Sequence, residues 1–359
     1  MSSPTHNTQA SPPLDISQIP LAFASCSIGP PNSTKYTLHQ KIEAIRNAGF
    51  NGIELSFPDL IAYAKLHFAR ESVDENDYPL LAEAAVAVRT LCDRHQITIM
   101  VLQPFSNFEG WAEGTAERED AFRRAKGWIE IMKAGGIKML QVGSTDSAED
   151  KITDDKEKLA ADLRQLADML GEHGFKLAYE NWCWATRAPY WKDVWEIVRL
   201  VDRENVGLCL DTFQTAGGEW GDPTTQSGLM TFDGGKEDLD RRYKQSLEEL
   251  IRTVPAEKIF FLQISDAYKM DGALKDEENE DGLRPRGQWS HDWRPLPYDG
   301  GYLPIEEFAG AVLKTGFRGW VSVEVFDGKF EDKYNGDLVW FARDAMRETR
   351  KLLAKGLSH

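Results

Sequence analysis

Eight short apolar segments with the composition of β-strands recur along the chain, and a helix-period segment follows each of them. In the helical segments, apolar residues return every three or four positions, which is the spacing of a helix that buries one face. Eight repeats of strand and helix predict an α/β fold, a single closed (β/α)8 barrel. The strand candidates cover residues 20–28, 51–57, 98–105, 138–144, 175–182, 206–213, 258–265 and 319–326.

The other arrangement for this pattern is an open, doubly wound sheet, which binds nucleotides through a glycine-rich loop at its switch point. No GxGxxG follows the first strand candidate, and GxxxxGK[ST] is absent. The chain of 359 residues has room for one barrel, and no linker divides it. We expect residues 19–359 to form a single barrel domain and residues 1–18 to be a disordered tail.

Charge and composition exclude several classes of protein. With 42 Lys and Arg against 58 Asp and Glu, the net charge is −16; this argues against nucleic-acid binding, which needs a basic surface. No apolar stretch approaches the ~20 residues that span a bilayer, and the N-terminus lacks the features of a secretory signal. We expect a cytoplasmic protein with reduced thiols, because no CxxC spacing occurs among the cysteines. These are Cys26, Cys92, Cys183 and Cys209.

Four polar side chains interrupt the apolar strand candidates, each near the C-terminal end of one of the last four strands. The strands of a closed barrel bring such residues to one point. Buried unpaired carboxylates are costly, so a bound cation is the simplest relief, and oxygen ligands suit Mg²⁺ or Mn²⁺. The alternative is that each carboxylate pairs with a separate Arg or Lys at the rim. The predicted metal ligands are Glu180, Asp211, Gln263 and Glu324.

This ligand pattern is similar to the metal site of the xylose-isomerase-like TIM barrels, and longer segments resemble the fungal 3-dehydroshikimate dehydratases of quinate catabolism. The likeness runs from about residue 20 to about residue 345. The resemblance implies the same four metal ligands, with Gln263 typical of the dehydratases where sugar epimerases and isomerases place His. The segments that carry it are NAGFNGIELSFPDL (47–60), VLQPFSNFEG (101–110), YENWCWATR (179–187), VGLCLDTFQTAGGEWGDP (206–223), QWSHDWR (288–294), GGYLPIEE (300–307) and GWVSVEVF (319–326).

The resemblance also implies the substrate contacts and the reaction. The substrate-binding Ser and Arg of the family, spaced S-x-x-x-R after the seventh strand, correspond to Ser290 and Arg294, and a guanidinium suits a cyclic carboxylate. Gln103 and Gln214 are further candidates for substrate binding. We expect a lyase that converts 3-dehydroshikimate into protocatechuate through a metal-stabilised enediolate.

The general base is left open by the sequence. Bacterial relatives place a basic residue, commonly His, three positions after the aspartate of the sixth strand, where this chain has Gln214, which takes no proton. The candidates for the catalytic base are His291 and a metal-bound carboxylate, either Glu180 or Glu324. His67 is a further histidine that would reach the mouth of the barrel from the segment after the second strand.

Other functions stay open on the same barrel. A metal-dependent sugar or cyclitol epimerase or isomerase shares proton abstraction beside a carbonyl, although Ser290 and Arg294 favour a carboxylate substrate. A catalytically silent binding protein would explain Gln214, but no metal ligand is missing. An endonuclease IV-like repair enzyme needs several zinc-binding histidines and a basic DNA face, and both are lacking. Whether the chain forms a homo-oligomer is also open.

Overall fold

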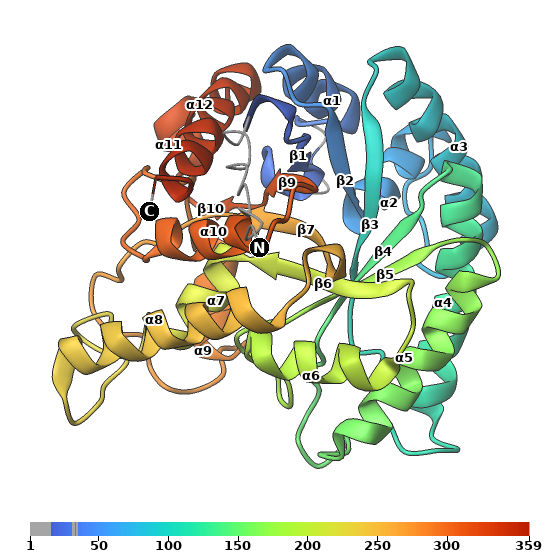
Figure 1. Cartoon of the computed structure of the whole chain (residues 1–359). Coiled ribbons are helices and arrows are strands. Elements are labelled where there is room, and N and C mark those ends of the chain that lie inside the picture. The colour runs from blue at the N-terminus through green and yellow to red at the C-terminus, as the bar shows by residue number, and fades with distance from the viewer. Residues whose placement is uncertain (1–15, 31–32, 34, 359) are drawn as a thin grey trace, which may run out of the picture.

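The structure, a computed structural model, describes residues 16–30, 33 and 35–358. In this part of the chain, eight parallel strands close into a barrel in sequence order, surrounded by helices (Figure 1). The barrel closes where β9 pairs with β1, with Leu21 opposite Val321. This confirms the predicted (β/α)8 barrel. Its strands are β1 (Leu21–Ala24), β2 (Gly52–Ser56), β3 (Thr98–Phe105), β4 (Met139–Gly143), β5 (Lys176–Glu180), β6 (Val206–Asp211), β7 (Ile259–Ile264) and β9 (Trp320–Val323).

The helices begin where short polar side chains cap them. Thr37 and Gln40 form a reciprocal capping box at the first helix, and Ser56 and Asp77 accept backbone N–H bonds at the next two. The helices are α1 (Leu38–Asn47), α2 (Phe57–His67), α3 (Tyr78–Arg94), α4 (Ala116–Gly135), α5 (Lys156–Gly171), α6 (Trp191–Val201), α7 (Thr212–Glu219), α8 (Gly235–Thr253), α9 (Pro285–Asp292), α10 (Ile305–Lys314), α11 (Phe330–Tyr334) and α12 (Leu338–Gly356).

The N-terminal part of the predicted pattern differs from the structure in two details. Of the predicted tail, residues 1–15 lie outside the described residues, whereas Ile16–Gln18 form a 3-10 helix, η1, with Ile16 packed against the core. The first strand stops at Ala24, because Ser25–Ser27 turn into a second 3-10 helix, η2. The polypeptide therefore bends over the barrel mouth earlier than the sequence pattern indicates.

The long segment after β7 folds over the C-terminal ends of the strands. It contains α9 and a short strand, β8 (Trp293–Arg294), which pairs antiparallel with β10 (Phe326–Asp327). Trp289 of α9 is fully buried, and its Nε1 donates to the carbonyl oxygen of Tyr268 at 2.9 Å. This anchor fixes Ser290 and Arg294 over the barrel.

The barrel interior changes from apolar to polar along the strands. Ala178, Cys209 and Phe261 belong to a small apolar cluster that fills the interior. Each lies two positions before a predicted metal ligand and therefore shares its inward face. The ligands thus stand one layer above an apolar floor.

Two composition-based expectations also bear on the fold. None of the described helices has the length and apolarity needed to cross a membrane. All four cysteines are free thiols; three are buried, and Cys26 is half-buried at the barrel mouth.

Candidate active site

Three carboxylates converge at the C-terminal end of the barrel. Glu180 ends β5, Asp211 ends β6, and Glu324 directly follows β9. One carboxylate oxygen of each lies within 4.8 Å of the others, and all three side chains are buried. The predicted meeting of these residues is therefore present in the structure, and such a group of oxygens is able to hold a cation.

The pKa values of these carboxyls show how crowded the negative charge is. Burial, and then the carboxylates of Glu324 and Asp211, raises the pKa of Glu180 well above its usual range. Burial raises the pKa of Glu324 to about 7, although Arg294 opposes the rise. Burial also raises the pKa of Asp211, again against the attraction of Arg294. A bound divalent cation would reverse these shifts, because it favours the ionised forms.

Glu180 has one oxygen that lacks any partner. Its Oε2 accepts hydrogen bonds from Gln141 Nε2 and from Trp182 Nε1, the latter at 3.0 Å. Its Oε1 is buried and has no hydrogen-bond partner in the part of the chain that the structure describes. An orphaned carboxylate oxygen beside two further carboxylates fits a divalent cation with oxygen ligands.

The fourth predicted ligand, Gln263, lies beside this group, in register with Asp211 on the neighbouring strand. Its Nε2 donates to Glu54 Oε2 at 2.9 Å, and its Oε1 accepts from the Cys209 thiol at 3.1 Å. A hydrogen bond from Gln263 also restrains the rise in the pKa of Glu324. The amide is therefore at the edge of the carboxylate cluster and is held from two sides.

Arg294 is buried in the middle of the site. Its Nη2 donates to Asp211 Oδ2 at 2.6 Å and to Glu324 Oε2 at 3.2 Å. Its guanidinium lies 4.6 Å from the ring centre of Phe213. One arginine thus pairs with two carboxylates, and no Lys or Arg of the described residues forms an ion pair with Glu180, so the pairing of each carboxylate with its own cation is wrong.

These contacts change what Arg294 can do for a substrate. The sequence predicts a planar clamp for a substrate carboxylate, but Nη2 is committed to Asp211 and Glu324, and Nε to Ser265 Oγ. Nη1 donates to Ser290 Oγ at 3.2 Å. Since Nη1 carries two N–H groups, the edge shared with Ser290 is the part of the guanidinium that remains for a ligand.

A cavity of about 430 Å³ opens above the carboxylates. Trp182 and Trp184 form one wall, with ring centres 5.2 Å apart and an angle of 21° between the planes. Glu180 and Glu324 reach the cavity, while Asp211 and Gln263 do not line it. A flat, mostly apolar wall opposite charged groups suits a small planar anion. The other predicted residues all line this cavity: Gln103, Gln214, Ser290, His291 and Arg294.

Gln214 contacts the protein backbone inside this cavity. Its side-chain Oε1 accepts from the backbone N–H of Cys183 at 2.9 Å. The backbone N–H of Gln214 donates to Asp211 Oδ1 at 3.0 Å. The side chain thus orders the turn after β5. Its Nε2 remains available to donate a hydrogen bond to a substrate.

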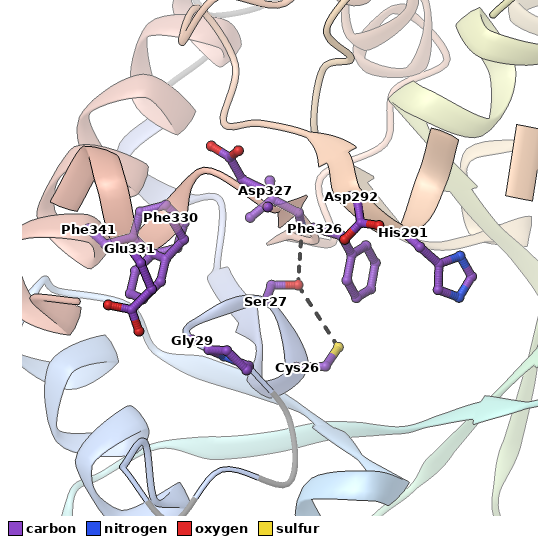
Figure 2. A pocket seen from close by; sticks show the side chains of 13 residues that line it. Cys26, Ser27, Gly29, His291, Asp292, Phe326, Asp327, Phe330, Glu331 and Phe341 are labelled. Carbon is purple, nitrogen blue, oxygen red and sulfur yellow. Dashed lines mark hydrogen bonds between the residues drawn. The ribbon is translucent and has the colours of Figure 1, made fainter. Parts of the chain in front are cut away.

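His291 stands between the main cavity and a smaller one of about 210 Å³. Figure 2 shows its ring directed away from Ser27, which lines the smaller cavity and not the main one. The ring centre lies 6.4 Å from that of Trp184, on the side of the main cavity. His67, in contrast, is exposed on α2, stacks on Tyr63 and does not line the main cavity.

The tautomer of His291 follows from its contact with the helix. Its Nδ1 lies 2.7 Å from the carbonyl oxygen of Gly287. A carbonyl only accepts, so Nδ1 carries the proton, and Nε2 of the neutral ring keeps its lone pair. This is the form that a general base requires.

Several residues of the site lie outside the sequence-based predictions. Gln141 bonds Glu180, Glu54 bonds Gln263, and Asp146 accepts from Trp184 Nε1 at 3.1 Å at the cavity edge. Glu54 and Gln141 each interrupt an apolar strand, as the predicted ligands do. The criterion that predicts the metal ligands, a polar residue within an apolar strand, therefore also identifies Glu54 in β2 and Gln141 in β4. Asp146 lies in a loop and carries no comparable signal.

This barrel, with acidic residues meeting at the ends of its last strands, is a xylose isomerase-like TIM barrel: residues 42–355 match the family of that description. A 3-dehydroshikimate dehydratase of Neurospora crassa is 30% identical over 323 residues, which is 87% of this chain and 88% of the relative. The chain belongs to the xylose isomerase-like TIM barrels and, among them, to the 3-dehydroshikimate dehydratase family. The predicted resemblance is confirmed.

Some other relatives are longer proteins, of which this chain spans less than half. A 3-dehydroshikimate dehydratase of Pseudomonas aeruginosa is 31% identical over 294 residues, and this chain spans 37% of it. A solved xylose isomerase-like TIM barrel/4-hydroxyphenylpyruvate dioxygenase fusion protein is 26% identical with a TM-score of 0.68, over 93% of this chain and 42% of that one. The IOLI protein, solved with a zinc atom, matches the fold at 20% identity, a TM-score of 0.66, and 95% and 100% coverage.

Proposed function

We propose that this protein is a 3-dehydroshikimate dehydratase, a hydro-lyase that forms protocatechuate and water with the aid of Mg²⁺ or Mn²⁺. The observation that carries the proposal is the meeting of Glu180, Asp211 and Glu324, with one unpartnered oxygen, under a cavity walled by tryptophan. The 3-dehydroshikimate dehydratase of Neurospora crassa, which aligns over most of both chains, supports 3-dehydroshikimate as the substrate.

The reaction needs a stabilised enolate, because the hydrogen α to a ketone is otherwise weakly acidic. Glu180, Asp211, Gln263 and Glu324 would hold the divalent cation, which supplies Lewis-acid stabilisation of the charge at the ketone oxygen. His291 Nε2 takes the α-proton, and the bond from the β-carbon to its hydroxyl breaks. The hydroxyl leaves as water with the proton that His291 Nε2 returns to it, and tautomerisation makes the ring aromatic.

The substrate is held by groups on opposite sides of the cavity. The Nη1 edge of Arg294 and the Ser290 hydroxyl bind the substrate carboxylate. The Trp182 and Trp184 wall stacks on the ring, which becomes planar as the product forms. Gln103 and Gln214 offer amide N–H groups to the ring oxygens.

An absorbance assay tests this function. Purified protein with Mn²⁺ should convert 3-dehydroshikimate into a product that absorbs in the near ultraviolet as protocatechuate does. Chelator should abolish turnover, and added Mn²⁺ or Mg²⁺ should restore it. Glu180→Gln should lower the rate by orders of magnitude, whereas Glu130→Gln, an exposed glutamate on α4, should not. Full turnover by metal-free protein, or isomerisation of a neutral sugar instead, overturns the proposal.

The compartment and the partners follow from the same proposal. Four free thiols support a reducing compartment, and we place the enzyme in the cytoplasm. Its partner is a small cyclic carboxylate, in keeping with the acidic chain and the arginine in the cavity.

A further inference from the structure

A fourth carboxylate faces the barrel interior outside the predicted ligand set. Glu54 lies in the middle of β2 and has no exposed surface. Its Oε2 accepts from Gln263 Nε2 at 2.9 Å. Its Oε1 is buried with no hydrogen-bond partner among the described residues, and the Ser322 hydroxyl restrains the rise in the pKa of this carboxyl. Burying a carboxylate for a single hydrogen bond costs stability. The proposed reaction assigns this group no step.

The contact between Glu54 and Gln263 selects one orientation of the amide. A carboxamide has a donor end and an acceptor end, and only the Nε2 end can face an accepting oxygen. Any proton on the Glu54 carboxyl has its place on the unpartnered Oε1, so Oε2 accepts in both protonation states. The Cys209 thiol, which donates to Gln263 Oε1 at 3.1 Å, specifies the same orientation.

Orientation decides whether Gln263 is able to bind a cation. The amide oxygen is a ligand for a hard cation, whereas the NH₂ end repels it. Oε1 has a second lone pair in addition to the one that meets the thiol. Histidine ligands of metals are fixed in the same manner, by a carboxylate that accepts from the other ring N–H.

Two other ligands accept hydrogen bonds from glutamines on other strands of the barrel. Gln103 of β3 donates to Glu324 Oε1 at 3.2 Å, and Gln141 of β4 donates to Glu180 Oε2. Strands β2, β3 and β4 thus each contribute one side chain that bonds a predicted ligand from β5, β7 or the end of β9.

We propose that Glu54 is a positioning residue for the metal site, which holds the Gln263 amide with its oxygen available to the cation. The proposal rests on the metal-dependent function above. It goes further by giving a role in metal affinity to a residue that need not touch the cation or the substrate.

Mn²⁺ binding to the full chain tests the proposal without substrate, for example by the electron paramagnetic resonance signal of free Mn²⁺. Glu54→Gln keeps the shape but presents a donor as well as an acceptor, so it no longer selects one orientation of Gln263, and Glu54→Asp keeps the charge and shortens the reach. Both should weaken Mn²⁺ binding about 10- to 100-fold. Glu109→Gln is the matched control: Glu109 is equally buried but bonds Thr145 and Tyr179 instead, and its variant should bind Mn²⁺ normally.

A double-mutant cycle separates positioning from plain charge. In a Gln263→Ala background, Glu54→Gln and Glu54→Asp should cause no further loss of Mn²⁺ affinity, because the amide they orient is gone. A persisting loss in that background, or wild-type affinity in Glu54→Asp, overturns the proposal. Should Glu54→Gln fail to fold, Glu54→Asp decides alone. Wild-type protein that binds Mn²⁺ but leaves 3-dehydroshikimate intact refutes the dehydratase function and leaves this test decisive.

Discussion

Two side-chain atoms, one on Glu180 and one on His291, give this site its chemical character. Glu180 Oε1 is buried with no hydrogen-bond partner among the described residues, and His291 Nε2 keeps a lone pair because Nδ1 is hydrogen-bonded to Gly287. The first atom is suited to a cation and the second to a proton. In the proposed function, the acid–base group and the metal ligand would therefore come from different elements of the same cavity.

His291→Asn tests the proton acceptor. If His291 is the base, kcat should fall about 10²- to 10⁴-fold, because a transition-state interaction is lost, while Mn²⁺ affinity stays unchanged. The acid limb of the pH–rate profile should change with it. His67→Asn is the control, since this exposed histidine lies away from the cavity. Superimposable profiles for wild type and His291→Asn would eliminate His291 as the base.

Arg294→Lys tests the charged edge of the cavity. An ammonium cannot replace the hydrogen bonds that the guanidinium shares among Asp211, Glu324 and Ser290. We expect KM for 3-dehydroshikimate to rise at least about tenfold, or roughly 1.4 kcal/mol in binding. Steady-state kinetics measure the change, with Arg199→Lys on the exposed face of α6 as the control. An unchanged KM rejects the substrate role of Arg294.

Whole elements set the shape of the cavity. The β8–β10 pair carries Arg294 opposite Phe326 and roofs the carboxylates. On the other side, the end of β4 makes space for the tryptophan wall. A Cβ at Gly143 would lie 2.2 Å from ring atoms of Trp182. Glycine is therefore required there for close approach of the two segments.

Gly143→Ala tests this approach. The added methyl should push Trp182 outward and break its bond to Glu180, raising KM and lowering Mn²⁺ affinity. Overpacking of this kind costs about 1–3 kcal/mol, so Tm should fall by several degrees. Gly171→Ala at the end of α5 is the control, because a Cβ there meets only Asn205 at 3.5 Å. Wild-type kinetics and Tm in Gly143→Ala would contradict the assignment.

At the scale of the whole molecule, ionisation of the buried carboxyl groups lowers the stability of the fold, and a bound cation would offset this cost. Burial raises the pKa of Glu324 to about 7 and, with the charge of Glu324, that of Glu54 to about 8. A carboxyl with a higher pKa in the folded state binds its proton more tightly when folded. Its contribution to stability is present at low pH and is lost as the pH rises from 4.5 towards the folded value.

Thermal unfolding with and without metal tests this balance. Metal-free protein should lose stability between about pH 5 and about pH 8. The gain in Tm on adding Mn²⁺ should grow over the same range, because the cation competes with protons for the carboxylates. The buried Glu109 and Asp266, whose pKa values burial raises to about 7, contribute to the first effect only. A metal-induced shift that is equal at pH 5 and pH 8, or equal in Glu180→Gln, contradicts the prediction.

The sequence by itself determined the barrel and the composition of its carboxylate cluster. Strand β3 occupies the predicted residues 98–105, and the other barrel strands lie within their predicted segments. Apolar runs and their periods are local signals, and a parallel barrel aligns all strand ends at one mouth. Glu180, Asp211 and Glu324 could therefore be placed together before their contacts were known.

Tertiary structure alone decided how these residues are paired. Arg294 meets Asp211 from 83 positions away, and Gln263 meets Glu54 from 209 positions away. The spacing of residues in the sequence predicts neither that Arg294 bonds carboxylates of the protein nor which way the Gln263 amide faces. Both depend on how distant segments pack. The tautomer of His291 likewise depends on α9, a helix within a segment that carries no regular pattern in the sequence.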